Sequence, residues 1–328
     1  MGKLITKLCH CKAFVLLLLF CLPLLAPIRT LGQEAEFDIF EKLANEADDL
    51  MNNNPDKAYK LSKKLLQKSL EAKNVKYEID ARCLLAVYYD QFLDLDSAMF
   101  QLKTAERLAR KTKDDQKLST VYNLVGNTFH NTMDYDSAIH YLKKAIKINK
   151  DNDLDWKLAA NYNNIANSYS KLGFFEEALE SYFSSLEIYE KHNDTSNLAI
   201  IHKNIGTEYL FHEKPEKALA HTKKSIQLSN ASKDTFNLCN TYNSLATIYK
   251  ETGEHHKAVK ILNNVINISK NKNYLVYIAQ SNHILGNIFT KEKKYTKAVR
   301  SYQRSLEISK ENGIIYGIMI NKIGLGGI

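Results

Sequence analysis

The chain has 328 residues, of which 45% are apolar and 25% charged, and it carries only 12 glycines and 4 prolines. This length favours a repeat array or two domains over one compact domain, while the composition excludes a disordered chain and disfavours an all-β fold. The formal net charge is +8, but the lysines are interleaved with acidic residues, and no basic patch with aromatic residues indicates nucleic-acid binding in this portion.

The N-terminal segment has the layout of a secretory signal peptide. Residues 1–12 contain three lysines and no acidic residue, and an apolar run follows at residues 13–28. As a helix this run would be about 24 Å long, shorter than the roughly 30 Å hydrocarbon core of a bilayer. We therefore predict a cleaved signal peptide at residues 1–32, and an exported chain in the periplasm or cell envelope without membrane contact after cleavage. The alternative is a chain anchored in the membrane by residues 13–28.

The remainder of the chain repeats itself with a period of forty residues. Alanine recurs at this spacing without interruption, at Ala58, Ala98, Ala138, Ala178, Ala218, Ala258 and Ala298. A second column is always aromatic: Tyr89, Phe129, Tyr169, Tyr209, Tyr249 and Phe289. A third column contains only alanine or glycine: Ala86, Gly126, Ala166, Gly206, Ala246 and Gly286. Three columns in one phase define a structural unit.

Residue size predicts what each column does. A position restricted to glycine or alanine marks a place where two helices cross closely, and the aromatic residue three positions later lies on the same helical face. Gly173 and Gly253 follow the first helix of their units, where a left-handed residue would end it. Each unit is therefore predicted to be a helix, a short turn and a second helix.

We predict four ranges along the chain. The signal peptide at residues 1–32 is followed by an N-terminal capping helical repeat at 33–78 and by six repeats at 79–318. Residues 319–328 are the start of a further repeat, which predicts that the sequence is a fragment of a longer protein, since repeat arrays normally end on a cap.

The columns resemble the pattern of the tetratricopeptide repeat, which is a Leu-Gly pair, an aromatic residue, alanine, an aromatic residue and alanine. Residues that match it include Gly126, Phe129, Ala138 and Ala145. The resemblance implies an all-α fold, a right-handed superhelical solenoid of antiparallel helix pairs. The period of forty departs from the family's usual unit of about thirty-four residues. Arrays of this kind with a signal sequence resemble the extracytoplasmic regions of bacterial signalling proteins.

The resemblance also implies that the first helices of successive units line a concave groove for a peptide. Residues three before and one after the small position lie on one helical face. The predicted peptide-binding residues are Asn123, Asn127, Asn163, Asn167, Lys203, Thr207, Asn243, Thr247, His283 and Asn287. Asparagine can both donate to and accept from a peptide backbone. The alternative is that an asparagine-rich chain places this residue on any solvated surface.

The sequence contains no recognisable enzyme motif and no cysteine pattern of a metal site outside the leader. Beyond the leader only Cys83 and Cys239 remain, four repeats apart and too distant for a disulfide. We therefore predict an exported, non-enzymatic scaffold without metal or cofactor, which binds a protein or peptide in its groove. The alternative is the sensory region of a truncated histidine kinase or of a repeat-linked transcription regulator.

Overall fold

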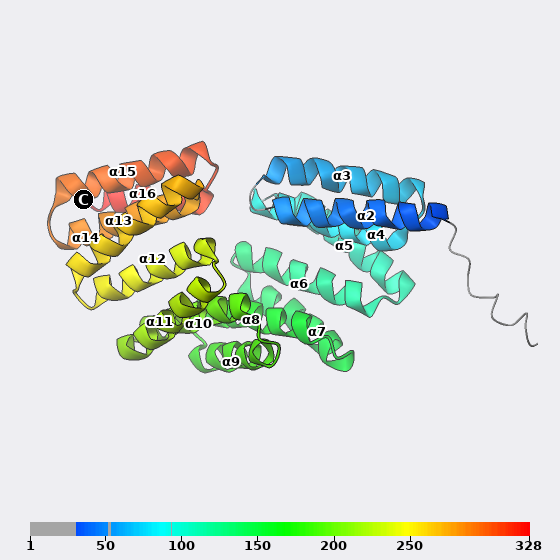
Figure 1. Ribbon diagram of the computed structural model, residues 1–328, viewed down its shortest axis with the longest axis horizontal. Coiled ribbons are helices and arrows are strands. Elements are labelled where there is room, and N and C mark those ends of the chain that lie inside the picture. The colour runs from blue at the N-terminus through cyan, green and yellow to red at the C-terminus, as the bar shows by residue number, and fades with distance from the viewer. Residues whose placement is uncertain (1–30, 52–53, 93) are drawn as a thin grey trace, which may run out of the picture. The chain divides into compact units, whose positions relative to one another are not determined.

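The computed structural model describes residues 31–328 with the exception of residues 52, 53 and 93. The predicted signal peptide lies outside the described residues apart from its last two. The described residues form fifteen helices and no strand (Figure 1), which confirms the predicted all-α fold. The helices are α2 (Leu31–Leu50), α3 (Pro55–Glu71), α4 (Val75–Gln91), α5 (Leu95–Thr112), α6 (Asp115–Asn131), α7 (Tyr135–Asp151), α8 (Asp155–Leu172), α9 (Phe175–Lys191), α10 (Thr195–Phe211), α11 (Pro215–Ala231), α12 (Thr235–Glu251), α13 (His255–Lys272), α14 (Leu275–Lys291), α15 (Tyr295–Glu311) and α16 (Ile315–Gly326).

The described residues form two compact units, one up to Leu84 and one from Leu85 onward. In the first unit, α2, α3 and the start of α4 enclose a small apolar core. The rings of Phe40 and Tyr77 stack in this core with their centroids 5.0 Å apart, and Leu65 is fully buried beside them. None of the described helices in either unit is long and apolar enough to cross a membrane.

The helices have nearly equal lengths because start and stop signals recur along the chain. Aspartates at five helix starts accept a hydrogen bond from the backbone N–H three residues ahead, which satisfies a donor that the helix leaves unpaired. These residues are Asp94, Asp114, Asp134, Asp194 and Asp234. At the other end, Gly173 ends α8 with a φ of 79° and Gly253 follows α12 with a φ of 78°. Both glycines lie in the left-handed region, as their positions in the sequence predicted.

The small residues lie where the two helices of a pair cross. Every alanine of the forty-residue column, from Ala58 to Ala298, is fully buried. A Cβ atom built on Gly126 would lie 2.7 Å from Leu142 Cγ on the partner helix, and one on Gly286 would lie 2.6 Å from the Tyr302 ring. Larger side chains would push the paired helices apart, so the predicted close crossing is confirmed.

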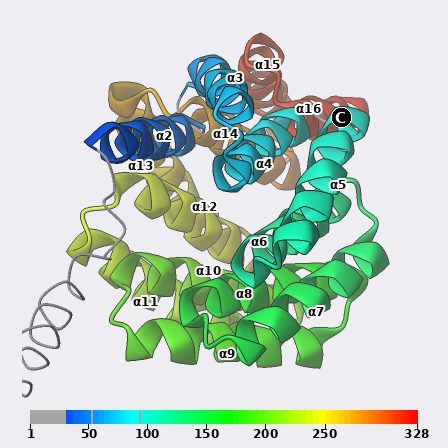
Figure 2. The same cartoon turned by 90° about the vertical axis from the view of Figure 1, so that its right-hand side faces the viewer.

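In the second unit the helix pairs stack in chain order and the stack is curved. The first helices of successive pairs, α6, α8, α10, α12 and α14, contact one another. The second helices, α7, α9, α11, α13 and α15, contact only first helices within this described unit. The first helices are therefore closer together and face the inside of the curve, as the arrangement of α6, α8, α10 and α12 shows (Figure 2).

Candidate functional site

All ten residues predicted to bind a peptide lie on first helices, but the structure separates them into two columns. The later column, Asn127, Asn167, Thr207, Thr247 and Asn287, is partly exposed. Asn127 and Asn167 line one open pocket, and Thr207 and Thr247 line another farther along the same face. This column therefore belongs to an accessible surface of the first helices.

The earlier column ties neighbouring first helices to one another. Asn163 Oδ1 accepts a hydrogen bond from Asn204 Nδ2 on the next first helix at 2.8 Å. Asn243 Oδ1 accepts from Ser281 Oγ at 2.7 Å, 38 residues along the chain. Two further members of the column are His283, whose Nδ1 lies 3.0 Å from Asn321 Oδ1, and Asn123. Lys203 completes the column, and burial lowers the pKa of its ammonium group. These side chains form part of the junction between repeats as well as the edge of the groove.

Asn123 belongs to a continuous chain of hydrogen bonds that crosses three repeats. We call this set the amide chain, and its members in order are Ser119, Asn149, Asn161, Asn123, Asn164, Asn163 and Asn204. Ser119, Asn149 and Asn161 are almost fully buried between α6, α7 and α8. From there the chain reaches Asn164 at the surface, because Asn161 Nδ2 and Asn164 Nδ2 both donate to Asn123 Oδ1, at 2.7 and 3.0 Å. Each amide fixes the orientation of the next, so the amide chain stiffens this part of the surface.

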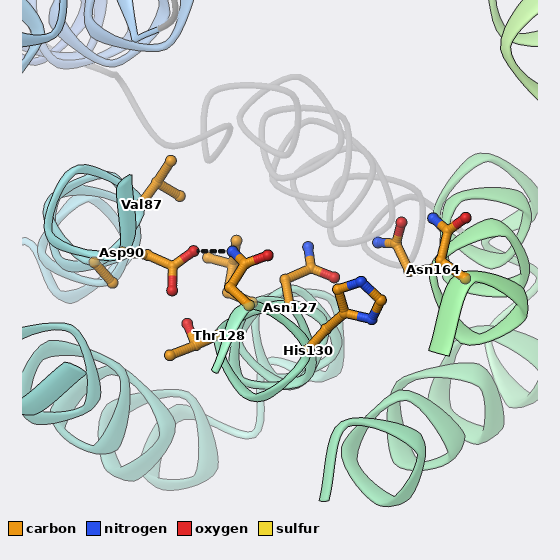
Figure 3. A pocket seen from close by; sticks show the side chains of 10 residues that line it. Val87, Asp90, Asn127, Thr128, His130 and Asn164 are labelled. Atoms are coloured by element: carbon orange, nitrogen blue, oxygen red, sulfur yellow. Dashed lines mark hydrogen bonds between the residues drawn. The ribbon is translucent and has the colours of Figure 1, made fainter. Parts of the chain in front are cut away.

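The first pocket lies between α4, α6 and α8 and has a volume of about 430 Å³. It is lined by Ala86, Val87, Asp90, Leu124, Asn127, Thr128, His130, Asn131, Asn164 and Asn167. Figure 3 shows Asp90 on α4 and Asn164 on α8 on either side of α6, which carries Asn127. Asn127 has no hydrogen-bond partner among the described residues. Asn167 Oδ1 accepts from Tyr182 Oη at 2.6 Å, which leaves the Asn167 N–H groups available to a ligand.

Among the described residues that line this pocket, Asp90 is the only one with a carboxylate. Asn131 Nδ2 donates to Asp90 Oδ2 at 2.5 Å, and this is the dashed line in Figure 3. Burial raises the pKa of the Asp90 carboxyl group, while its hydrogen bonds to Asn131 and Thr128 act in the opposite direction. Burial and the charge of Lys171 lower the pKa of His130, so this ring is neutral at pH 7.

The second pocket lies between α10 and α12 and combines apolar with charged residues. It has a volume of about 600 Å³ and is lined by Leu210, Phe211, Glu213, Pro215, Thr247, Lys250, Glu251 and Thr252. A smaller pocket of about 90 Å³ adjoins it and shares Leu210 and Phe211. The Phe211 side chain is 67% exposed, although an aromatic residue usually loses water contact on folding. Its ring is therefore accessible from the pocket.

Several residues that line these pockets are not among those predicted from the sequence. Asn164 and Asn131 belong to stripes beside the predicted columns, and Phe211 occupies the position equivalent to Asn131 two repeats later. A signal for them does exist, because residues 124, 127 and 131 follow the spacing of one helical face. Within the described part of the chain, no group of three histidine, cysteine or acidic side chains is placed to hold a metal ion. Cys83 and Cys239 are both buried.

Comparison with known proteins identifies the repeat. One family model of the tetratricopeptide repeat matches residues 157–231 and 237–311, and a second model of the same repeat matches residues 119–152. No curated protein sequence matches the chain.

Several solved structures are similar in fold. Aspartyl phosphate phosphatase F from Bacillus subtilis has a TM-score of 0.66 at 14% identity, over 85% of this chain and 72% of that protein. The apo form of RapI has a TM-score of 0.64 at 14% identity, over 85% and 99% of the two chains. NprR in complex with its cognate peptide NprX has a TM-score of 0.60 at 19% identity, over 82% and 76%. At these identities the similarity shows a shared solenoid of helix pairs.

Proposed function

Because the chain belongs to the tetratricopeptide repeat family, we propose that it binds a peptide, or an extended segment of a protein, along the surface of its first helices. The observation that carries this proposal is the pair of open pockets on that surface. In one pocket the amide of Asn127 and the N–H groups of Asn167 have no hydrogen-bond partner among the described residues. In the other pocket the Phe211 ring is exposed to solvent. NprR, a solved structure of the same fold, contains its cognate peptide.

The two pockets suit different parts of a peptide. An amide side chain can donate to a backbone carbonyl and accept from a backbone N–H, so Asn127 and Asn167 would hold the main chain irrespective of its sequence. Phe211 would pack against an apolar side chain of the ligand, a contact that excludes water from both surfaces. The amide groups of Asn127 and Asn167 and the phenyl ring of Phe211 do not ionise at neutral pH, and we assign this surface a binding role and no catalytic step.

The amide chain supports this role by fixing one edge of the surface before the ligand arrives. Asn164 both donates to Asn123 and accepts from Asn163, so its amide group has a set orientation. Groups that are already ordered lose less side-chain entropy on binding, and more of the contact energy then contributes to affinity.

A peptide-binding experiment with two matched phenylalanine variants tests the proposal. Pools of acetylated and amidated random octapeptides, labelled with fluorescein, are titrated with the protein, and fluorescence polarisation gives the affinity. Phe211→Ala should weaken binding about tenfold, because a buried aromatic contact contributes roughly 1.5–3 kcal/mol. Phe100→Ala on α5 removes an equally exposed ring, 63% against 67%, and should leave affinity unchanged. If Phe100→Ala loses binding and Phe211→Ala does not, the peptide contacts α5 and not the surface of the first helices.

We also propose that the chain is exported, which rests on the charge and hydropathy of residues 1–28. Expression of the full chain in a bacterium, followed by cell fractionation and N-terminal sequencing, tests this. The expected product is periplasmic and begins near Gln33. A cytoplasmic product that still begins at Met1 would contradict export, and a full-length product in the membrane fraction would support the anchored alternative.

A further inference from the structure

One column of the first helices changes chemistry from repeat to repeat while the aromatic column directly before it stays constant. Its members are Asp90, His130, Ser170, Leu210, Lys250 and Thr290. A position that the fold required for packing would be restricted in size and polarity, as the alanine column is. This column instead varies in charge, and four of its members, Asp90, His130, Leu210 and Lys250, line the two larger pockets. Such variation at a pocket-lining position can make the pocket selective for a ligand.

Asp90 is a charged member of this column that has no ion-pair partner among the described residues. Its carboxylate accepts hydrogen bonds from Asn131 and Thr128, both of which are uncharged. No lysine or arginine lines the pocket, and no basic side chain among the described residues forms an ion pair with Asp90. The remaining titratable group in the pocket, His130, has its pKa lowered and is neutral at pH 7. The pocket thus holds one partly buried negative charge without a counter-ion.

We propose that this pocket binds a positively charged nitrogen of the peptide ligand, with Asp90 as its counter-ion. The inference rests on the proposed function and adds a ligand class to it. The charged nitrogen can come from a lysine or arginine side chain or from a free N-terminal amine, since both donate several charge-assisted hydrogen bonds to a carboxylate.

The geometry of the pocket fits such a group. Its volume of about 430 Å³ lies in the usual range for small-ligand sites. Asn127 has no partner among the described residues, so its Oδ1 can accept from a cation that Asp90 neutralises. Val87 and Leu124 offer apolar surface against which the methylene groups of a long basic side chain can lie.

Five fluorescein-labelled peptide pools test the proposal. Four are acetylated, amidated octapeptides of neutral residues with arginine, lysine, glutamate or methionine fixed at the centre, and the fifth is a neutral pool with a free N-terminus. The wild-type protein should bind the arginine, lysine or free-amine pool about tenfold more tightly than the methionine pool. In Asp90→Asn, which keeps the side-chain shape, the ratio of affinities between that pool and the methionine pool should fall to nearly one.

Two controls separate charge from folding. Glu180→Gln removes an exposed carboxylate from α9 and should leave the preference intact. If Asp90→Asn lowers the melting temperature, Asp90→Ser replaces it in the test, because serine occupies the equivalent position at Ser170. The same loss of preference is expected in Asp90→Ser.

The outcomes distinguish this inference from the proposed function. A preference confined to the arginine and lysine pools identifies a side chain as the cation, and one confined to the free-amine pool identifies the N-terminus. Wild-type binding to every pool with equal affinity, or a basic preference that survives Asp90→Asn and Asp90→Ser, overturns the inference and leaves peptide binding standing. If no pool binds the wild-type protein, peptide binding is contradicted and the inference is overturned with it.

Discussion

Replacing Asn127 and Asn167 together by alanine is expected to weaken the tightest-binding peptide pool about thirtyfold or more. Each substitution removes hydrogen bonds to a peptide main chain, and each bond lost from a buried interface costs roughly 1–3 kcal/mol. Helicity should be unchanged, because alanine is a better helix former than asparagine. Fluorescence polarisation measures the affinity, and circular dichroism measures the helix content.

Tyr182→Phe is the matched control for this double variant. The Tyr182 hydroxyl group donates to Asn167 Oδ1, so Asn167→Ala also removes an internal hydrogen bond. Tyr182→Phe removes the same bond and leaves both amides in the pocket. It should lower stability by about 1 kcal/mol with little change in affinity. Equal losses of affinity in Tyr182→Phe and in the double variant would assign the effect to the fold and contradict a direct contact with the ligand.

Ala178→Leu is expected to lower the free energy of unfolding by roughly 1–3 kcal/mol or more. Ala178 is fully buried where α8 and α9 cross, and the added atoms would force the two helices apart. The measurement is the urea midpoint followed by circular dichroism, with the slope checked because repeat arrays do not always unfold in one step. Ala220→Leu on the exposed face of α11 should change the free energy by less than about 0.5 kcal/mol. Equal midpoints for wild type and Ala178→Leu would place this alanine away from any tight crossing.

The architecture could be predicted because close helix crossings restrict residue size. A Cβ atom built on Gly126 or Gly286 would clash with the partner helix, and Ala178 is fully buried. Such restrictions are visible in the sequence as columns of constant size. Helix starts carry a local signal for a similar reason, since an aspartate at a helix start pairs with a donor only three residues away.

The surface chemistry was less predictable because it depends on how successive pairs tilt against each other. Asn123 and Asn127 lie four residues apart on one helical face, but Asn123 is hydrogen-bonded to the next first helix and Asn127 faces the pocket. The repeat spacing of the sequence contains no information about this tilt. Glu208 is a second example, since it occupies a column with isoleucine at Ile248 and Ile288.

Glu208 itself is almost fully buried, although glutamate is usually exposed. Its carboxylate accepts a hydrogen bond from the Ser170 hydroxyl group on the preceding first helix and lies 3.4 Å from His212 Nε2. Ser170 is 38 residues away in the sequence, and nothing in the local pattern marks the two residues as partners. Long-range pairs of this kind become visible only once the helices are placed.

The amide chain has a consequence for how the protein folds. Units that share one period and the same small and aromatic columns present similar faces, so a newly formed pair could stack on the wrong neighbour. Asn161 meets both Asn149 and Asn123 only when α8 lies against α6 and α7. In a misplaced stack these amides would be buried without partners, at roughly 1–3 kcal/mol for each unpaired group. The buried asparagines would therefore disfavour stacking of a helix pair on the wrong neighbour.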